Sequence, residues 1–222
     1  MIVFGHQPSA STQQMMGAGE ACRAIKEAED GIPIIMIGGH VSALPERTLE
    51  DEAVDFVCKG EGPVTVVQLL DALDDGKIEN PEKIEGLVWM RDGKAVVNPA
   101  AALISDMDKD LNGNVWDLLP MDKYRAHNWQ CFGNLDTREP YASIYTSLGC
   151  PYQCAFCCIN APFDINRYRM RSPEAVVAEI DLLHNTYGIK TYKIIDEMFV
   201  LNDRHVNAIC DLLIERYYGL NI

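Results

Sequence analysis

Four of the eight cysteines lie within nine residues, in the stretch SLGCPYQCAFCC that runs from Ser147 to Cys158. Three of them have the spacing Cys150-x3-Cys154-x2-Cys157, and Cys158 follows directly. Neighbouring cysteines can form disulfides, hold a structural zinc ion or bind an iron–sulfur cluster. Their spacing and the cell compartment help to decide among these three chemistries.

The rest of the sequence argues against disulfides. It shows no N-terminal signal segment and no run of about 18 apolar residues that could span a bilayer. We therefore expect a cytoplasmic protein, in which a cysteine cluster favours metal or redox chemistry. With 222 residues, 48% of them apolar, the chain can bury one or two cores. Its formal charge of −14 argues against a nucleic-acid or anionic-membrane partner.

A zinc site fits the stretch less well than a cluster does. Structural zinc takes four nitrogen or sulfur ligands, commonly as two pairs far apart in the sequence, and no convincing second pair occurs here. Cys158 is adjacent to Cys157, and adjacent side chains rarely converge on one small ion. Three cysteines on one loop better match an iron–sulfur cube with one iron left open for another ligand.

The other cysteines are scattered along the chain. Cys22 and Cys210 fall in amphipathic helical patterns, so we expect both to be buried and inert thiols. For Cys158, packing behind a cluster is favoured over a catalytic or radical-quenching role.

The first half of the chain alternates between strand and helix. Apolar strands are predicted at residues 1–5, 32–39 and 53–58, and Pro63 opens a helix after the third. This alternation predicts a parallel sheet with right-handed crossovers, which binds ligands at the carboxyl ends of its strands. The Gly- and Ser-rich loops GHQPSAST, GGHVSALPE and KGEGP follow those strands.

The helices of this half should each present one apolar face to the sheet. The first is predicted over Gln13–Ala28, and the second begins at Pro63. The residues predicted to face inward are Met16, Cys22 and Ile25 in the first helix, and Val66, Val67, Leu70 and Leu73 in the second.

Next, Asp92–Gly93 between two β-rich arms predicts a hairpin. Residues 99–140 form a linker with DLLPMDKYR as an anchor, and the α/β plan then resumes. YASIYTSLG and KTYKIIDEMF are strands, Ser172 caps a helix that begins at Pro173, and Asn202 or Asp203 starts the last one. The predicted inward faces are Val176, Val177, Ile180 and Leu183, then Val206, Ile209 and Leu213.

The C-x3-C-x2-C loop after a strand, with Phe156 before its third cysteine, resembles the radical S-adenosylmethionine (SAM) superfamily. By that resemblance, Cys150, Cys154 and Cys157 hold a [4Fe-4S] cluster whose open iron binds the amino and carboxylate groups of SAM. The resemblance also implies a reducing donor of flavodoxin or ferredoxin type. SAM is then cleaved to a 5′-deoxyadenosyl radical, which abstracts a hydrogen atom, while the protein orients the cofactors and excludes water.

The same resemblance makes Phe156, Asp196 and Glu197 candidates for contact with SAM. In the superfamily the second barrel strand ends against the methionine amine, and IIDEMF occupies that position here. The alternative for Asp196 is a cap on the following turn. Three arginines follow the loop: Arg167, Arg169 and Arg171. We expect each of them either to steady the loop, to meet a carboxylate or to lie on the surface.

The order of GGHVSALPE, VDFVCKGEGPVTVVQLLDAL, hairpin and cysteine loop resembles the cobalamin-binding radical enzymes, whose N-terminal domain is Rossmann-like. The resemblance covers nearly the whole chain. It places beside cobalamin the residues Ser9, Ser11, Thr12, Gly38, Gly39, His40, Ser42, Gly60, Glu61 and Gly62.

One part of the cobalamin pattern is missing. The D-x-H-x-x-G signature, which supplies a histidine to cobalt in some cobalamin proteins, is absent. His6 has Phe4 and Ser9 where that motif wants Asp and Gly. Many radical members also lack the histidine, so cobalamin is still expected, with His6 and His40 as loop or lining residues.

These resemblances predict an α/β chain in three parts. Residues 1–80 form a partial Rossmann-like cobalamin domain, 81–140 a hairpin and linker, and 141–222 the first βα units of a partial radical SAM TIM-type barrel. The match starts inside the first domain and stops early in the barrel. We therefore expect a chain truncated at both ends, or one part of a split protein.

The leading interpretation is a radical SAM enzyme that transfers a methyl group through cobalamin, or does related radical chemistry, on an unidentified small molecule or peptide. A methylthiotransferase-like enzyme without cobalamin is the second. A non-catalytic fragment that holds a cluster or corrin is the third, and a zinc module the fourth.

Overall fold

The computed structural model describes residues 2–4, 8–74, 77–113, 115–125, 139–157, 159–216 and 219–220. The chain divides into two compact units. The first unit comprises residues 1–103 together with 150–167, and the second comprises 104–149 together with 168–222. The loop that carries the cysteine cluster thus belongs to the first unit. The predicted domain boundaries at residues 80 and 140 stay a prediction.

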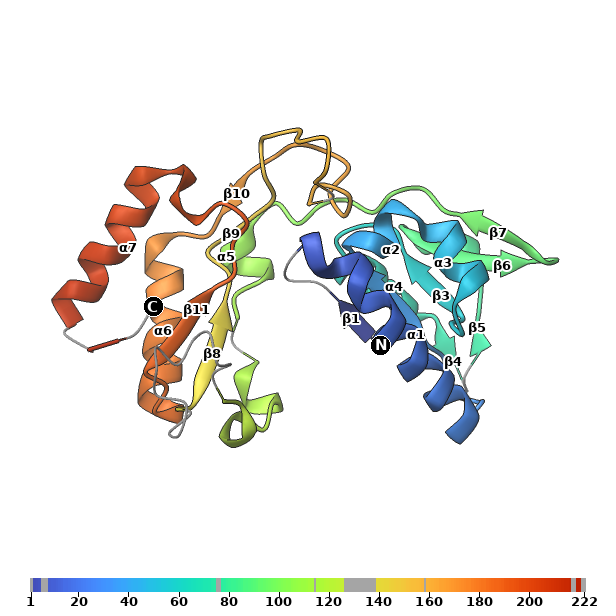
Figure 1. Ribbon diagram of the computed structural model, residues 1–222, viewed down its shortest axis with the longest axis horizontal. Coiled ribbons are helices and arrows are strands. Elements are labelled where there is room, and N and C mark those ends of the chain that lie inside the picture. Colours follow the sequence, from blue (N-terminus) through green and yellow to red (C-terminus); the bar gives the residue numbers. More distant parts are fainter. Residues whose placement is uncertain are drawn as a thin grey trace. The chain divides into compact units, whose positions relative to one another are not determined.

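The first unit is built on a five-stranded sheet in the order β1-β2-β3-β6-β7 (Figure 1). The first three strands are parallel, as predicted, and the last two continue the sheet in antiparallel fashion. The strands are β1 (Ile2–Phe4), β2 (Ile35–Gly38), β3 (Phe56–Cys58), β6 (Leu87–Arg91) and β7 (Lys94–Val97).

Helices cover both faces of this sheet. The helices α1 (Pro8–Ala28), α2 (Gly39–Ala43) and α3 (Pro45–Asp51) share a buried core with Met36 of β2. On the opposite face, α4 (Pro63–Asp71) packs against the neighbouring strand residues such as Ile35 and Ile37. This division follows from the alternation of side chains along each strand, so continuous apolar runs can supply two cores.

Short elements complete the first unit. A small hairpin of β4 (Leu73–Asp74) and β5 (Lys77–Ile78) follows α4, and a 3-10 turn η1 (Pro81–Lys83) leads into β6. Asp92 and Gly93 join β6 to β7 with φ of 51° and 74°. Two positive φ values define the type I′ turn that Asp-Gly favours, so the predicted hairpin is confirmed.

The second unit centres on a parallel pair of strands, β8 and β11, whose register runs from Tyr141 opposite Thr191 to Ile144 opposite Ile194. Strand β9, which precedes the cysteine loop, and strand β10, which follows it, form a short antiparallel pair. The elements are α5 (Met107–Asp110), η2 (Trp116–Leu118), η3 (Met121–Lys123), β8 (Tyr141–Ile144), β9 (Ser147–Leu148), β10 (Arg169–Met170), α6 (Pro173–Tyr187), β11 (Thr191–Ile194), η4 (Phe199–Leu201) and α7 (Asp203–Arg216).

Helix α6 forms as the sequence predicts. The hydroxyl of Ser172 accepts a hydrogen bond from the backbone N–H of Ala175 at 3.2 Å, and Pro173 occupies the first turn. Gly188 ends the helix with φ of 66°, a conformation that glycine adopts without steric cost. The predicted inward residues are fully buried: Val176, Val177, Ile180 and Leu183. They share their core with Ile209 of α7 and Met121 of the DLLPMDKYR anchor.

Several inward-facing predictions were wrong by one position on a helix, or about 100° around its axis. Met16 is 81% exposed, because α1 turns Met15, Ala18 and Cys22 toward the sheet instead. On α4, the exposed residues are Val67 and Leu70, and Leu69 takes the buried position. Cys210 is exposed because its neighbour Ile209 faces the core of the second unit.

Two boundary predictions also change. Helix α1 begins at Pro8, so Ser9, Ser11 and Thr12 lie in its first turns and not in a loop. The predicted strand YASIYTSLG is split into β8 and β9, because Thr146 is drawn into side-chain hydrogen bonds described below.

Candidate cluster and cofactor site

The cysteine loop, residues 150–167, joins β9 to β10. Cys150 is buried, while Cys154 and Cys157 are exposed, and the N–H of Cys157 donates to the carbonyl of Cys154 at 3.0 Å. That bond closes a tight turn that carries two thiols. Cys158 lies outside the described residues, as do Cys131 and His6.

The donor set fits an iron–sulfur cluster. No group of three His, Cys, Asp or Glu side chains in the described part of the chain is arranged to hold one metal ion. A cubane cluster makes a different demand, because each thiolate binds its own iron and the sulfurs need not converge on a point. Three thiols in one loop, two of them accessible, meet that demand.

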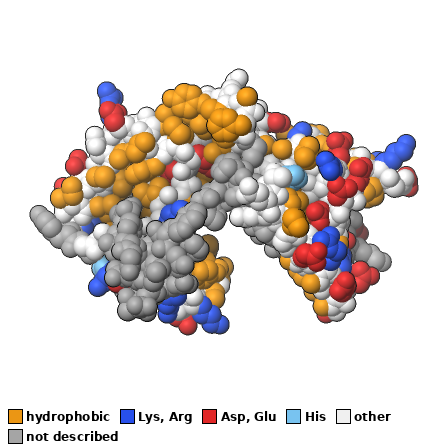
Figure 2. Space-filling model, in the orientation of Figure 1, with side chains coloured by type: hydrophobic (Ala, Val, Ile, Leu, Met, Phe, Trp, Pro, Cys, Tyr) orange, Lys and Arg blue, Asp and Glu red, His pale blue; other side chains and the backbone are white. Residues whose placement is uncertain are grey.

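Apolar side chains gather over the same loop, as Figure 2 shows. Phe156 is 94% exposed, and Tyr152 and Ile165 are about half exposed at 54% and 44%. An aromatic ring with so few protein contacts is available to a ligand, and Phe156 directly precedes the third cysteine of the motif.

The three arginines after the loop differ in environment. Arg167 is exposed, whereas Arg169 is buried and donates to the carbonyl of Ile104 at 2.6 Å. Arg171 is buried and forms an ion pair with the buried Glu179. Of the predicted alternatives, the surface position is wrong for Arg169 and Arg171, which are buried, and a role beside the cluster stays a prediction.

In the second unit, Asp196 ties the end of β11 to the link between β8 and β9. Its carboxylate accepts from the N–H of Thr146 at 2.7 Å, the hydroxyl of Thr146 at 2.5 Å and that of Ser147 at 2.6 Å. Three such bonds make Asp196 a positioning group for the chain that leads into the cysteine loop. The predicted contact of Asp196 with SAM stays a prediction.

His205 extends this network. Its Nε2 lies 3.3 Å from the hydroxyl oxygen of Thr146. That hydroxyl donates its hydrogen to Asp196, so Nε2 of His205 must donate to the hydroxyl oxygen. The neutral ring therefore carries its proton on Nε2. Burial lowers the pKa of His205, and the nearby Asp196 charge opposes that shift.

Glu197 occupies a different environment from Asp196. Its Oε2 is buried and has no hydrogen-bond partner among the described residues. Burial raises the pKa of Glu197, the Asp196 charge raises it further, and hydrogen bonds from its own N–H and that of Gly149 oppose the shift. Burial together with the Glu197 and Asp196 charges raises the pKa of Tyr145 to about 12. The Glu197 carboxylate therefore has one buried oxygen, Oε2, without a hydrogen-bond partner in the described part of the chain.

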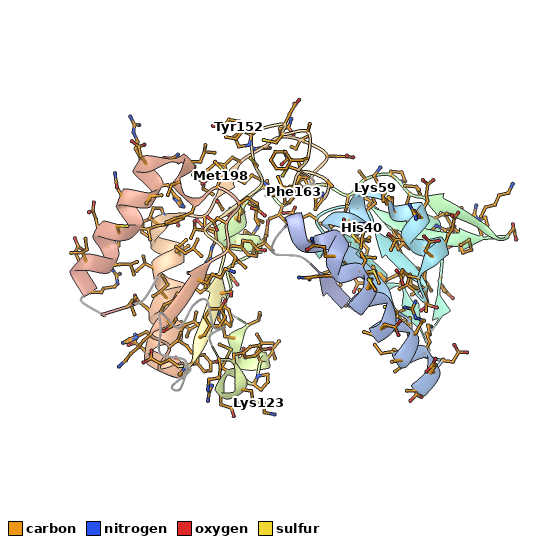
Figure 3. All side chains as sticks on the ribbon, in the orientation of Figure 1. His40, Lys59, Lys123, Tyr152, Phe163 and Met198 are labelled. Atoms are coloured by element: carbon orange, nitrogen blue, oxygen red, sulfur yellow. The ribbon has the colours of Figure 1, made fainter. Side chains whose placement is uncertain are left out.

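The predicted cobalamin residues gather at the carboxyl ends of β2 and β3. His40 follows β2 and Lys59 follows β3 at this edge of the sheet (Figure 3). The hydroxyl of Thr12 lies 3.0 Å from Nδ1 of His40. The hydroxyl of Ser42 accepts from the N–H of Gly60 at 3.2 Å and donates to its carbonyl at 3.4 Å. Nothing is described of the Ser9 and Ser11 side chains.

The glycines of this edge have backbone conformations that side chains rarely adopt. Gly60 has φ of 143° and Gly62 has φ of 111°. A Cβ added at Gly60 would lie 4.0 Å from the carbonyl oxygen of Pro162, so the cysteine loop passes beside this turn. The structure thereby brings the Gly60–Gly62 turn and the cysteine loop together within the first unit. Gly38, Gly39 and Glu61 complete the edge, and Gly39 lies in α2 rather than in a loop.

Sequence reasoning missed three candidates: Thr146 and His205, which join the Asp196 network, and Asn160, whose Oδ1 accepts from the N–H of Cys150 at 3.2 Å. Thr146 and His205 are joined to Asp196 only by folding, and no motif marks them. Asn160 lies three residues after Cys157, and its position near the motif was the one available signal.

Comparisons with known proteins found relatives by sequence and solved structures with the same fold. No family model matches the chain. An uncharacterized methyltransferase of Pyrococcus horikoshii is 34% identical over 197 residues, which are 88% of this chain and 40% of the relative. The anaerobic magnesium-protoporphyrin IX monomethyl ester cyclase of Synechocystis is 26% identical over 226 residues, 100% of this chain and 41% of the relative. The chain thus spans about two fifths of the length of these relatives.

Solved structures share the fold. The radical SAM methyltransferase TsrM from Kitasatospora setae, with cobalamin and a [4Fe-4S] cluster bound, has a TM-score of 0.63 at 23% identity and matches 93% of this chain and 38% of its own. The cobalamin-dependent SAM radical enzyme OxsB, with aqua-cobalamin bound, has a TM-score of 0.62 at 21% identity, over 92% of this chain and 28% of its own.

The chain has a mixed α/β fold with parallel strands, which it shares with the solved structures of cobalamin-dependent radical SAM enzymes. By sequence and fold, the chain is a relative of the cobalamin-dependent radical SAM enzymes. Within the described residues, no helix is both long and apolar enough to cross a membrane.

Proposed function

We propose that this chain is the cluster-binding and partly corrin-binding portion of a cobalamin-dependent radical SAM methyltransferase. One observation carries the proposal. The cysteine loop belongs to the same compact unit as the strand ends predicted to line cobalamin, and it passes beside Gly60. Methyl transfer through a corrin needs both cofactors near one substrate, because the reacting groups must be held within reach of each other.

When bound, a reduced [4Fe-4S] cluster supplies the electron that cleaves SAM, and cobalamin carries the methyl group. The chain's own residues hold these groups in place. We assign the cluster to the thiolates of Cys150, Cys154 and Cys157, and a stacking contact with SAM to the exposed ring of Phe156.

Glu197 is the better of the two acidic candidates for the ammonium group of SAM. Its buried Oε2 accepts no hydrogen bond from the described residues, whereas both oxygens of Asp196 already accept from Thr146 and Ser147. A buried carboxylate gains most from a cation, because pairing removes the cost of its burial. Asp196 then acts mainly by positioning the chain ahead of the loop.

On the corrin side, the turn at Gly60–Gly62 allows close backbone approach, since neither glycine has a side chain to block it. Ser42 holds this turn through Gly60, and Thr12 orients the ring of His40. We therefore propose that Thr12, His40 and the two glycines line the corrin, with Ser42 as their support. Electrons come from a flavodoxin- or ferredoxin-type donor.

A radical SAM enzyme without cobalamin is the second candidate, and the absent D-x-H-x-x-G signature favours it. Reconstitution separates the two. The chain is loaded anaerobically with iron, sulfide and hydroxocobalamin, desalted, and assayed for iron, for corrin absorption bands and for 5′-deoxyadenosine after reduction with SAM. A Cys154→Ala variant is the control for cluster chemistry.

The proposal predicts about four irons per wild-type chain, retained corrin bands and 5′-deoxyadenosine that the variant does not form. A cluster without corrin bands would favour the second candidate. A cluster and corrin without 5′-deoxyadenosine would identify a non-catalytic binding fragment. Zinc retained in place of iron would overturn all three readings.

A further inference from the structure

Asn160 connects the two sides of the cysteine loop through its side chain. Its Oδ1 accepts a hydrogen bond from the N–H of Cys150 at 3.2 Å. Its Nδ2 donates to the carbonyl of Tyr152 at 3.1 Å and to Oδ1 of Asn166 at 2.9 Å. All three partners lie in the loop itself, within the first unit.

The orientation of this amide is dictated by its partners. A backbone N–H can only donate and a backbone carbonyl can only accept, so Cys150 requires the oxygen of Asn160 and Tyr152 requires its nitrogen. Both hydrogens of Nδ2 are then used. No exchange of the oxygen and nitrogen would keep these bonds, which makes the arrangement specific for asparagine.

The backbone of Asn160 also organises the return of the loop. Its carbonyl accepts from the N–H of Phe163 and from that of Asp164, each at 3.0 Å. Tyr152 and Phe163 are labelled on this loop in Figure 3. Asn160 thus joins the segment around Cys150 to the segment from Phe163 to Asn166.

The two halves of the cysteine motif are held by different means. The turn from Cys154 to Cys157 is closed by its own backbone hydrogen bond. Cys150 stands four residues earlier, beyond Pro151, and its backbone N–H is bound by Asn160. The position of the Cys150 thiol relative to the loop's return segment therefore depends on Asn160.

We propose that Asn160 is a positioning residue for the cluster: it fixes the backbone of Cys150 so that this thiolate meets the same cluster as Cys154 and Cys157. The inference rests on the proposed function. Groups that orient metal ligands commonly change metal affinity by about 10- to 100-fold when they are replaced. Asn160 acts at the backbone of a ligand and has no contact with reacting atoms.

The test compares two variants with wild type after anaerobic reconstitution. Asn160→Ala removes all three side-chain bonds, whereas Asn160→Asp keeps an oxygen for the Cys150 N–H and loses both donors. Two controls are matched: Asn166→Ala removes one of the three bonds, and Asn207→Ala replaces an exposed asparagine on α7. The readouts are the rate of iron loss to a chelator and the electron paramagnetic resonance (EPR) spectrum of the reduced cluster with and without SAM.

We expect Asn160→Ala to lose iron about tenfold faster than wild type and to show an altered spectrum, with an unchanged far-ultraviolet circular dichroism spectrum. Asn160→Asp should recover part of the difference, Asn166→Ala should lie close to wild type, and Asn207→Ala should match it. Wild-type iron loss and spectra in both Asn160 variants would overturn the positioning role. A wild-type chain that binds no cluster would overturn the proposed function first, and this inference with it.

Discussion

Glu197 is the residue whose environment most clearly supports the proposed SAM contact. The Oε2 atom of Glu197 is buried without a hydrogen-bond partner among the described residues, and this opposes folding because that oxygen loses its hydration without a replacement bond there. Its raised pKa means that the carboxyl favours the protonated form in the fold. This contribution to stability is present at low pH and is lost as the pH rises through the raised pKa.

We expect Glu197→Gln to be more stable than wild type near pH 7, with a thermal midpoint higher by about 2–4 °C. The difference should disappear below about pH 4.5, where the carboxyl is protonated in both states. The same variant should bind SAM roughly tenfold less tightly, the loss of one charge-assisted hydrogen bond. Differential scanning fluorimetry and equilibrium binding measure the two effects.

Glu215→Gln is the matched control, because Glu215 is exposed on α7. It should change neither stability nor SAM binding. Equal SAM affinity in wild type and Glu197→Gln would remove Glu197 from the proposed site.

His205 gives a second prediction, on the pH dependence of stability. A buried histidine with a lowered pKa stays neutral in the fold while the unfolded chain takes up a proton near pH 6.5. Its contribution to stability is therefore complete above pH 6.5 and falls as the pH drops toward the lowered folded value. In His205→Gln, whose amide can still donate to Thr146, this fall should be absent.

Urea midpoints of the two proteins from pH 5 to 8 measure that difference. Subtracting the variant from wild type cancels the titration of the many surface carboxylates. Parallel curves over the whole range would show that His205 contributes no pH dependence.

At the scale of elements, the sequence predicts best where local rules act alone. Strands β2 and β3, the Asp92–Gly93 turn and the capped helix α6 follow from apolar runs, turn chemistry and Ser172. Which of two adjacent apolar residues is buried depends on the neighbouring elements, so the sequence predicts Met16 as buried where the fold buries Met15. The pattern of a helix fixes its periodicity but not its rotation about the axis.

The candidate site was predictable to a similar degree. The spacing of Cys150, Cys154 and Cys157 is local and is readable in the sequence. The bonds of Asp196 to Thr146 and Ser147 join residues about 50 positions apart, and they exist only once β8 and β11 are paired. No local signal in the sequence marks such partners.

The core of the second unit yields an element-scale prediction. Ile180 is fully buried between α6, α7 and the strands, so Ile180→Ala should destabilise the chain by about 2–5 kcal/mol. Ile214 on α7 is 63% exposed, and Ile214→Ala should change stability by about 0.5 kcal/mol or less. Urea denaturation of both variants measures the contrast, and equal losses would contradict the assigned faces of α6 and α7.

At the scale of the whole molecule, the cysteine loop is the feature that relates the two halves of the sequence. It follows the strands of the second unit along the chain, yet it packs with the first unit beside Gly60. A cysteine loop within the same unit as the Gly60–Gly62 turn can serve a chemistry that uses two cofactors. This arrangement is the physical basis for proposing that cluster and corrin work together.

The most direct test of that account is EPR spectroscopy of the reduced, reconstituted chain before and after SAM is added. We predict the signal of a reduced [4Fe-4S] cluster in wild type, a change in that signal on SAM binding at the open iron, and loss of the signal in Cys154→Ala. A wild-type signal that SAM leaves unchanged, or a signal that survives in Cys154→Ala, would contradict the central claim that Cys150, Cys154 and Cys157 hold a SAM-binding cluster.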